Sequence, residues 1–174
     1  MARYIEVVLK KRDVRSAAIL LDQEAPATCG AVWTALPLEG DVFHAKYASN
    51  EIYTLVAPFA EPELELENYT LTPFTGEIMY FRLHPWHRLP REAQDIQAAG
   101  RGAVDLAIFY DRNNFLFSPR LGPMPGNIFA RIVTNMEGMA TACHSIWREG
   151  AVGERLVFQR LEGKRLKELG IADG

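Results

Sequence analysis

Residues 104–110 have the sequence VDLAIFY, in which Val104, Leu106, Ile108 and Tyr110 alternate with their neighbours. A period of two places one set of side chains on one face of a β-strand. Short segments with similar strand character precede and follow it, at residues 3–10, 14–22, 41–48, 51–56, 69–72, 76–83, 127–133 and 154–161. The sequence therefore predicts a mainly β protein.

Two segments instead show helical spacing. The first begins at Pro26, has apolar residues at intervals of three and four, and ends before Pro37. In the second, Thr134 and Glu137 match a capping box, and Gly150 is expected to end the helix. The apolar face of this second helix is predicted to consist of Met136, Met139, Ala140, Cys143, Ile146 and Trp147.

Seven or eight short strands with two helices lack the regular alternation of a βαβ fold. A closed β-barrel of about eight strands capped by two α-helices is the simplest arrangement, because closure leaves no exposed strand edge. We expect a single domain over residues 1–174, with an insertion loop or arm at 84–103 and a charged C-terminal tail at 162–174.

Charge and composition exclude several classes of protein. The 19 basic and 22 acidic side chains give a net charge of −3, and without a basic run we expect no nucleic-acid binding. The sequence has no apolar stretch of membrane-spanning length and no signal-peptide core, which predicts a cytoplasmic protein without membrane contact. Cys29 and Cys143 are expected to be buried, reduced thiols.

Several strings, in the same order along the chain, resemble cyclophilins. DQEAPAT at 22–28 is similar to the entry to the first cyclophilin helix, and Phe43-His44 is similar to the start of the active-site strand. IFARI at 128–132 and MEGM at 136–139 resemble the late strand and the entry to the second helix. The resemblance implies a cyclophilin-like barrel.

A closer resemblance is to small bacterial cyclophilin-like proteins of unknown function. NEIY at 50–53, GEIMY at 76–80 and AIFYD at 107–111 are similar to strings shared by that group. ALPLEG at 35–40, followed by Phe43-His44-Ala45, resembles one uncharacterised bacterial domain family within it. The family has no established function, so the resemblance implies the fold and no activity.

The resemblance also bears on prolyl isomerase activity. In cyclophilin isomerases an Arg follows the Phe-His pair, and this sequence has Ala45 there. Tyr53 stands at the position of the pocket Gln, and Gly126 at that of a late-strand His. Loss of one such polar group typically costs on the order of 10²–10³ in rate. We therefore predict no catalytic residues and no isomerase mechanism, with weak isomerase activity as an alternative.

The resemblance implies a concave groove on the barrel face, and a small metabolite or a peptide segment is the ligand we expect. The aromatic residues at these positions could equally plug the barrel, and His44 could be a hydrogen-bonded core residue. The candidate ligand-binding residues are His44, Lys46, Asn50, Glu51, Tyr53, Tyr80, Phe109, Asn127 and Phe129.

A second hypothesis gives the chain a structural or assembly role. The 84–103 segment carries an exposed-looking Trp beside Arg, a composition typical of an interface anchor in a homo-oligomer. Its candidate interface residues are His84, Trp86, His87 and Arg88. His84 and His87, together with His44, lack a convincing third ligand, so neither a metal nor a cofactor is predicted. The acidic residues Glu61, Glu63, Glu65 and Glu67 are expected to form a solvated connector.

Overall fold

A computed structural model describes residues 2–48 and 50–171, apart from the side chain of Gln97. Its strands are β1 (Tyr4–Leu9), β2 (Val14–Leu20), β3 (Leu38–His44), β4 (Glu51–Val56), β5 (Tyr69–Thr70), β6 (Glu77–Leu83), β7 (Ala103–Phe109), β8 (Phe117–Ser118), β9 (Gly122–Pro123), β10 (Gly126–Ile132) and β11 (Arg155–Leu161). Its helices are α1 (Pro26–Ala35), η1 (Arg91–Ala93), α2 (Gln94–Ala98), α3 (Met136–Glu149) and α4 (Lys164–Glu168).

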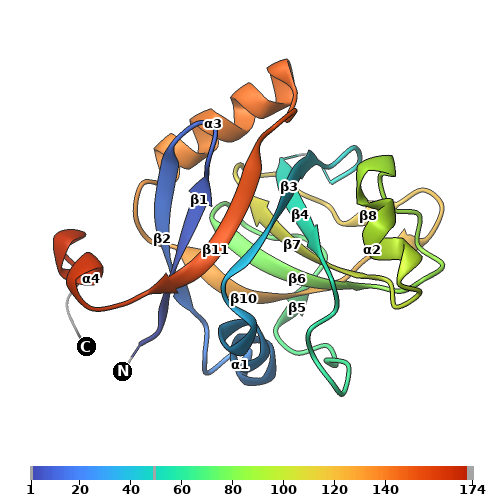
Figure 1. Ribbon diagram of the computed structural model, residues 1–174, viewed down its shortest axis with the longest axis horizontal. Helices are drawn as coiled ribbons and strands as arrows, with labels where there is room; N and C mark the ends of the chain where they lie inside the picture. Colours follow the sequence, from blue (N-terminus) through green and yellow to red (C-terminus); the bar gives the residue numbers. More distant parts are fainter. Residues whose placement is uncertain (1, 49, 172–174) are drawn as a thin grey trace.

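Eight antiparallel strands form a closed barrel in the order β2-β1-β11-β3-β4-β7-β6-β10 (Figure 1). The barrel closes where Ala130 to Ile132 of β10 pair with Ala18 to Leu20 of β2. The short strand β5 pairs with the start of β10, and β8 and β9 form a separate two-stranded sheet. The expected barrel of about eight strands is confirmed.

Strand β7 is buried along its whole length. Val104, Leu106 and Ile108 point into the barrel, where they join a core that includes residues of β1, β4, β6, β10 and β11. Ala107 and Phe109 point outward and pack with Met79, Phe81, Leu116 and Ile128. Because the outer face of β7 is also covered, the segments that cover it define a second, smaller core outside the barrel.

Two helices close the ends of the barrel, as predicted (Figure 1). Helix α1 contributes Cys29 and Val32 to the core, and α3 contributes Met139, Ala142, Cys143 and Ile146. Both cysteines are buried and free, and burial raises the pKa of Cys29 to about 12. Both thiols are therefore inert, in agreement with the expectation of reduced core residues.

The predicted capping box of Thr134 and Glu137 at the start of the second helix is wrong. Asn135, with φ of 53°, precedes α3, and no side chain caps the helix start. The Thr134 hydroxyl instead accepts a hydrogen bond from the Ala17 N–H at 2.8 Å, which ties the turn to β2. Trp147 was also misplaced, because 66% of it is exposed, whereas Ala142 is buried. Gly150 ends the helix, and its N–H donates to the Ile146 carbonyl.

The acidic connector is more than a solvated segment. The Glu67 carboxylate accepts hydrogen bonds from the Thr28 N–H at 2.6 Å and from the Thr28 hydroxyl at 2.7 Å. Glu61 pairs with Arg101, and Glu63 lies 3.2 Å from Arg82. Because Ala25 at the start of α1 has no capping side chain, Glu67 caps this helix from 39 residues away in the chain.

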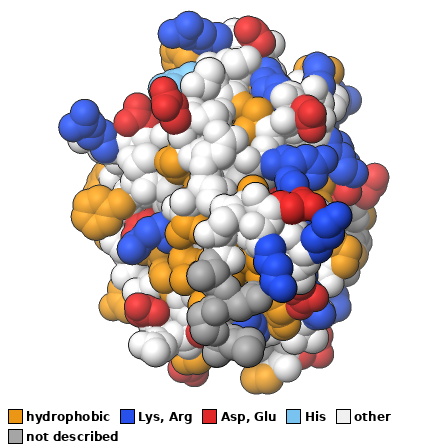
Figure 2. All heavy atoms as spheres, turned by 90° about the vertical axis from the view of Figure 1, so that its left-hand side faces the viewer, with side chains coloured by type: hydrophobic (Ala, Val, Ile, Leu, Met, Phe, Trp, Pro, Cys, Tyr) orange, Lys and Arg blue, Asp and Glu red, His pale blue; other side chains and the backbone are white. Residues whose placement is uncertain are grey.

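The predicted tail at 162–174 contains the short helix α4, whose Arg165 lies 3.2 Å from the buried Glu6 of β1. Residues 172–174 of that tail lie outside the described residues. The molecular face beside α4 carries basic and acidic side chains interspersed (Figure 2). None of the described helices is long and apolar enough to cross a membrane.

Glu67→Ala is expected to lower the free energy of unfolding by about 1–3 kcal/mol, because it leaves N–H donors at the start of α1 without a charged acceptor. Urea unfolding followed by circular dichroism measures the loss. Glu65→Ala is the matched control, since Glu65 lies in the same connector with an exposed side chain. Equal losses in both variants would show that Glu67 does not stabilise the helix.

Candidate functional site

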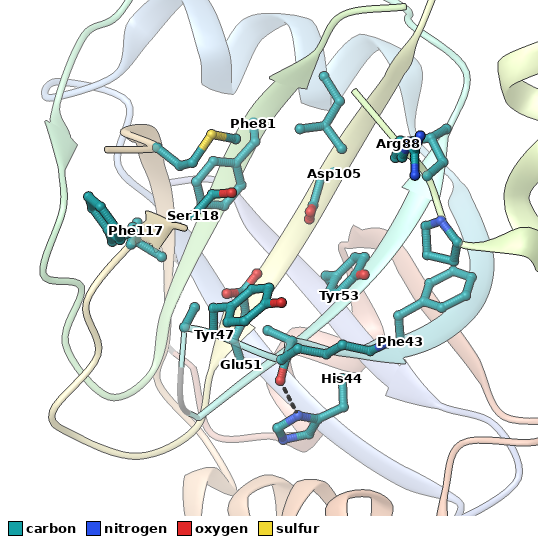
Figure 3. A pocket seen from close by; sticks show the side chains of 18 of the residues that line it. Phe43, His44, Tyr47, Glu51, Tyr53, Phe81, Arg88, Asp105, Phe117 and Ser118 are labelled. Carbon is teal, nitrogen blue, oxygen red and sulfur yellow. Dashed lines mark hydrogen bonds between the residues drawn. The ribbon is translucent and has the colours of Figure 1, made fainter. Parts of the chain in front are cut away.

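A cavity of about 600 Å³ lies on the outer face of the barrel wall (Figure 3). Strands β3, β4, β6 and β7 form its floor, the 84–103 segment forms one wall, and the region of β8 forms another. Its lining residues are Phe43, His44, Ala45, Lys46, Tyr47, Ala48, Glu51, Tyr53, Phe81, Leu83, Arg88, Leu89, Pro90, Arg91, Glu92, Asp105, Leu116, Phe117, Ser118 and Met124.

Aromatic side chains give the cavity flat apolar surfaces. Phe43 of β3 and Tyr53 of β4 are register partners, and their rings stack with centroids 5.4 Å apart and planes 29° apart. Phe81 projects outward from β6. A Cβ atom at Gly126 would lie 2.6 Å from the Phe81 ring, so only glycine in β10 leaves this ring room.

Two buried carboxyl groups lie on the cavity floor, one on either side of Tyr53. Glu51 of β4 is 5% exposed and Asp105 of β7 is 8% exposed. Neither side chain makes a hydrogen bond or an ion pair with the residues that the structure describes, and Oδ1 of Asp105 is fully buried without a partner. Figure 3 shows Glu51, Tyr53 and Asp105 directed into the same space.

The environment of these two acids favours their neutral forms. Burial raises the pKa of Glu51 to about 8. Burial, together with the charge of Glu51, raises the pKa of Asp105 well above its usual value. Burial and the two carboxyls also raise the pKa of the Tyr53 hydroxyl. Both carboxyls on the cavity floor are therefore harder to ionise than exposed carboxyls.

Basic side chains occupy the rim. Lys46, Arg88 and Arg91 are exposed, and none of them forms an ion pair with any described residue. They do not compensate the buried acids, because no basic nitrogen of the described residues lies within 4.0 Å of a carboxyl oxygen of Glu51 or Asp105. The cavity thus has an acidic floor, aromatic walls and a basic rim.

His44 borders the cavity, but its ring points away toward the end of the barrel that α3 covers (Figure 3). Nδ1 lies 2.8 Å from the Ala45 carbonyl oxygen and must therefore donate, so Nε2 of the neutral ring accepts from the Tyr110 hydroxyl at 2.7 Å. Burial lowers the pKa of His44. His44 is thus a hydrogen-bonded structural histidine in the barrel wall.

The cavity brings together Lys46, Glu51 and Tyr53 from the predicted binding residues, with His44 at its border. The other five predicted residues lie elsewhere. Tyr80 and Phe129 are in the barrel core, and Phe109 is fully buried in the outer core. The Asn127 amide donates to Thr28 and to the Glu65 carbonyl, and the Asn50 amide donates to the Arg112 carbonyl.

Asp105, one of the two acids on the cavity floor, is not among the binding residues predicted from the sequence. Its signal was present, since Asp105 is the one charged residue in the segment VDLAIFY. A polar residue on the outer face of a strand is normally solvated, and nothing local indicated that the segments 88–92 and 116–124 cover this one.

The predicted interface residues divide into two groups. Arg88 lines the cavity, and beyond it Leu89, Ala93 and Ile96 pack against the chain's own barrel. Trp86 is 64% exposed and stacks on His84, with ring centroids 4.3 Å apart, while His87 stacks beside them. No group of three His, Cys, Asp or Glu side chains suited to a metal ion occurs within residues 2–48 and 50–171.

A barrel closed by two helices, with a cavity on the outer face of its wall, belongs to the cyclophilin-like class. The chain is similar to McbB, whose structure was solved in complex with tryptophan, with a TM-score of 0.65 and 16% identity over 91% of this chain. It spans only 45% of the McbB chain. The hypothetical protein AF2241 from Archaeoglobus fulgidus is similar with a TM-score of 0.49 and 17% identity, over 91% of this chain and 95% of that one.

Residues 7–158 match the family described as protein of unknown function (DUF3830), and the chain belongs to this family. No curated protein matches the sequence. The expected membership of an uncharacterised cyclophilin-like family is therefore confirmed, while its bacterial distribution stays a prediction.

Glu51→Gln is expected to stabilise the protein increasingly as the pH rises from 5 to 8. The pKa of Glu51 in the folded protein, about 8, lies above the ordinary value of 4.5. The contribution of Glu51 to the free energy of unfolding is therefore fully present below about pH 4.5, and it is lost as the pH rises toward 8. Glutamine does not titrate, so the difference in unfolding free energy should grow by up to about 4 kcal/mol.

Urea unfolding of wild type and Glu51→Gln at pH 5, 6, 7 and 8 measures this difference. Glu92→Gln is the control, because Glu92 is exposed at the rim of the same cavity and should give a constant difference. A Glu51→Gln difference that is also independent of pH would show that Glu51 is already ionised in the folded protein at pH 5.

Proposed function

We propose that this protein binds a small organic molecule with a flat apolar part in the outer cavity, without the prolyl isomerase mechanism. The cavity of about 600 Å³ carries this proposal, because binding sites for small molecules typically enclose about 300–1,000 Å³ between apolar and aromatic walls with a few polar groups. Phe43, Tyr53 and Phe81 provide such walls.

The isomerase mechanism is set aside on the residues themselves. Ala45 lines the cavity at the position where the resemblance to cyclophilins expects Arg, and its methyl group cannot donate a hydrogen bond to a proline carbonyl. Gly126, at the position of the late-strand His, packs against the ring of Phe81, which leaves no room for a side chain there. The proposal is thus one of binding and assigns no catalytic residue.

The similarity to McbB supports a choice of first ligands. That protein was solved in complex with tryptophan, an aromatic amino acid. At 16% identity the similarity concerns the fold, and we carry over only the ligand class as a hypothesis. Aromatic amino acids, and amines and acids derived from them, are therefore the compounds to test first.

At least one member of such a panel is expected to bind the wild-type protein and to raise its melting temperature. Tyr53→Ala should weaken that binding about tenfold, because a stacked aromatic pair contributes about 0.5–1.5 kcal/mol beyond the apolar area it buries. Isothermal titration calorimetry measures the affinity. Tyr69→Ala is the control, since Tyr69 is exposed on β5 outside the cavity. Unchanged affinity in Tyr53→Ala would place the ligand elsewhere.

An assembly role is the second candidate, favoured by the exposure of Trp86 on its stack with His84. If this surface joins two protomers, wild type should elute from a size-exclusion column as an oligomer and Trp86→Ala as a monomer. Trp147→Ala should leave the elution unchanged, although Trp147 on α3 is similarly exposed at 66%. Monomeric wild type at every concentration tested would rule this role out.

A further inference from the structure

The two acids on the cavity floor lack any partner of opposite charge. Glu51 and Asp105 project from neighbouring strands, β4 and β7, which pair in register and place both side chains on the outer face of the wall. Both are more than nine-tenths buried, and no described residue donates a hydrogen bond to either carboxyl. Structural carboxyls at such depth are normally paired or hydrogen-bonded.

Other buried acids of this protein follow that normal pattern. Glu154, whose side chain is fully buried, accepts hydrogen bonds from the Lys11 N–H at 2.7 Å and from Arg12 at 3.0 Å. Glu6, on the opposite side of the barrel, accepts from Arg15, Arg165 and Gln159. Glu51 and Asp105 therefore differ in chemistry from the structural acids, and they are the two that face a cavity.

We infer that the ligand of this cavity carries a protonated primary amine, which lies on the floor at Glu51 and Asp105 while the apolar part of the ligand contacts Phe43 and Tyr53. This inference rests on the proposed function and names the class of ligand. An ammonium group supplies both properties that the floor lacks, namely positive charge and N–H donors.

Alternative polar groups fit the floor less well. A carboxylate on the ligand would lie beside two acids and would have to stay protonated there. A neutral hydroxyl has one donor for two carboxyls and carries no positive charge that could pair with a carboxylate. Lys46, Arg88 and Arg91 on the exposed rim remain available for an anionic group at the other end of the ligand.

Binding of an ammonium ion should release protons from the floor. Burial raises the pKa of Glu51 to about 8 and that of Asp105 well above its ordinary value, and a nearby positive charge favours the ionised forms of both. In this step Glu51 releases its proton to solvent, and the resulting carboxylate pairs with the ligand ammonium. The negative charge of the carboxylate is thereby balanced by the positive charge of the ligand. The apparent affinity should therefore rise between pH 6 and pH 8, where the ammonium itself remains protonated.

Tryptamine, tryptophol and indole-3-propionate test the inference, because they share an indole and end in a cation, a neutral hydroxyl and an anion respectively. In titration calorimetry at pH 7.5, tryptamine should bind at least tenfold more tightly than tryptophol. Its binding heat should differ between phosphate and Tris buffers, which report released protons. Glu51→Gln and Asp105→Asn should remove most of the preference for tryptamine and leave tryptophol binding unchanged.

Glu65→Gln is the matched control, since it makes the same chemical change at an exposed position outside the cavity and should preserve the preference. Tryptophol or indole-3-propionate binding as tightly as tryptamine would overturn the inference and leave the proposed function standing. Binding of none of the three indoles, with no compound of the wider panel raising the melting temperature, would overturn both. Tryptamine preference that survives in both floor variants would also overturn the assignment to Glu51 and Asp105.

Discussion

Burial of strand β7 on both faces is the constraint on which the rest of this structure depends. Its inward side chains form the centre of the barrel core, as expected for the wall of a closed barrel. Its outward side chains are apolar too, except for Asp105, and exposing them would cost about 25 cal/mol for each Å² of apolar surface. The segments at 84–103 and 112–125 therefore fold back over the wall, and the cavity lies where they do not fill the space.

This arrangement explains why the cavity is both apolar and acidic. Residues on the outer face of a barrel strand normally contact water, and Glu51 and Asp105 stand at such positions. Once the two covering segments are in place, the same carboxyls become buried without partners. The pKa of each carboxyl is then raised, because desolvation penalises the charge. The cavity thus combines apolar walls with two buried carboxyl groups that can pair with a cation.

Elsewhere in the barrel, buried polar groups form hydrogen bonds with residues that are distant in the sequence. Glu67 caps α1, Thr134 binds the backbone of β2, and the Asn127 amide links β10 to Thr28 and to the Glu65 carbonyl. Each contact replaces a local cap or a water molecule with a partner many residues away. These contacts fix both closing helices on the barrel, whereas the two carboxyls on the cavity floor have no such partner among the described residues.

The sequence by itself determined the main strands and the two helices that close the barrel, because alternation in segments such as 104–110 and the three-and-four spacing after Pro26 and Thr134 depend only on local geometry. It did not predict the short elements α2, α4, β8 and β9. The strings shared with cyclophilin-like proteins supported the closed barrel that the number of strands had already favoured. Only the tertiary structure decided which side chains meet in the cavity. Asp105 was not among the predicted residues, and Tyr80 and Phe129 lie in the barrel core and not along the cavity. A period of two separates the two faces of a strand without saying which face lies along a cavity. The capping of α1 by Glu67 could not be predicted from the sequence either, because a contact between residues 39 positions apart has no local sequence signature.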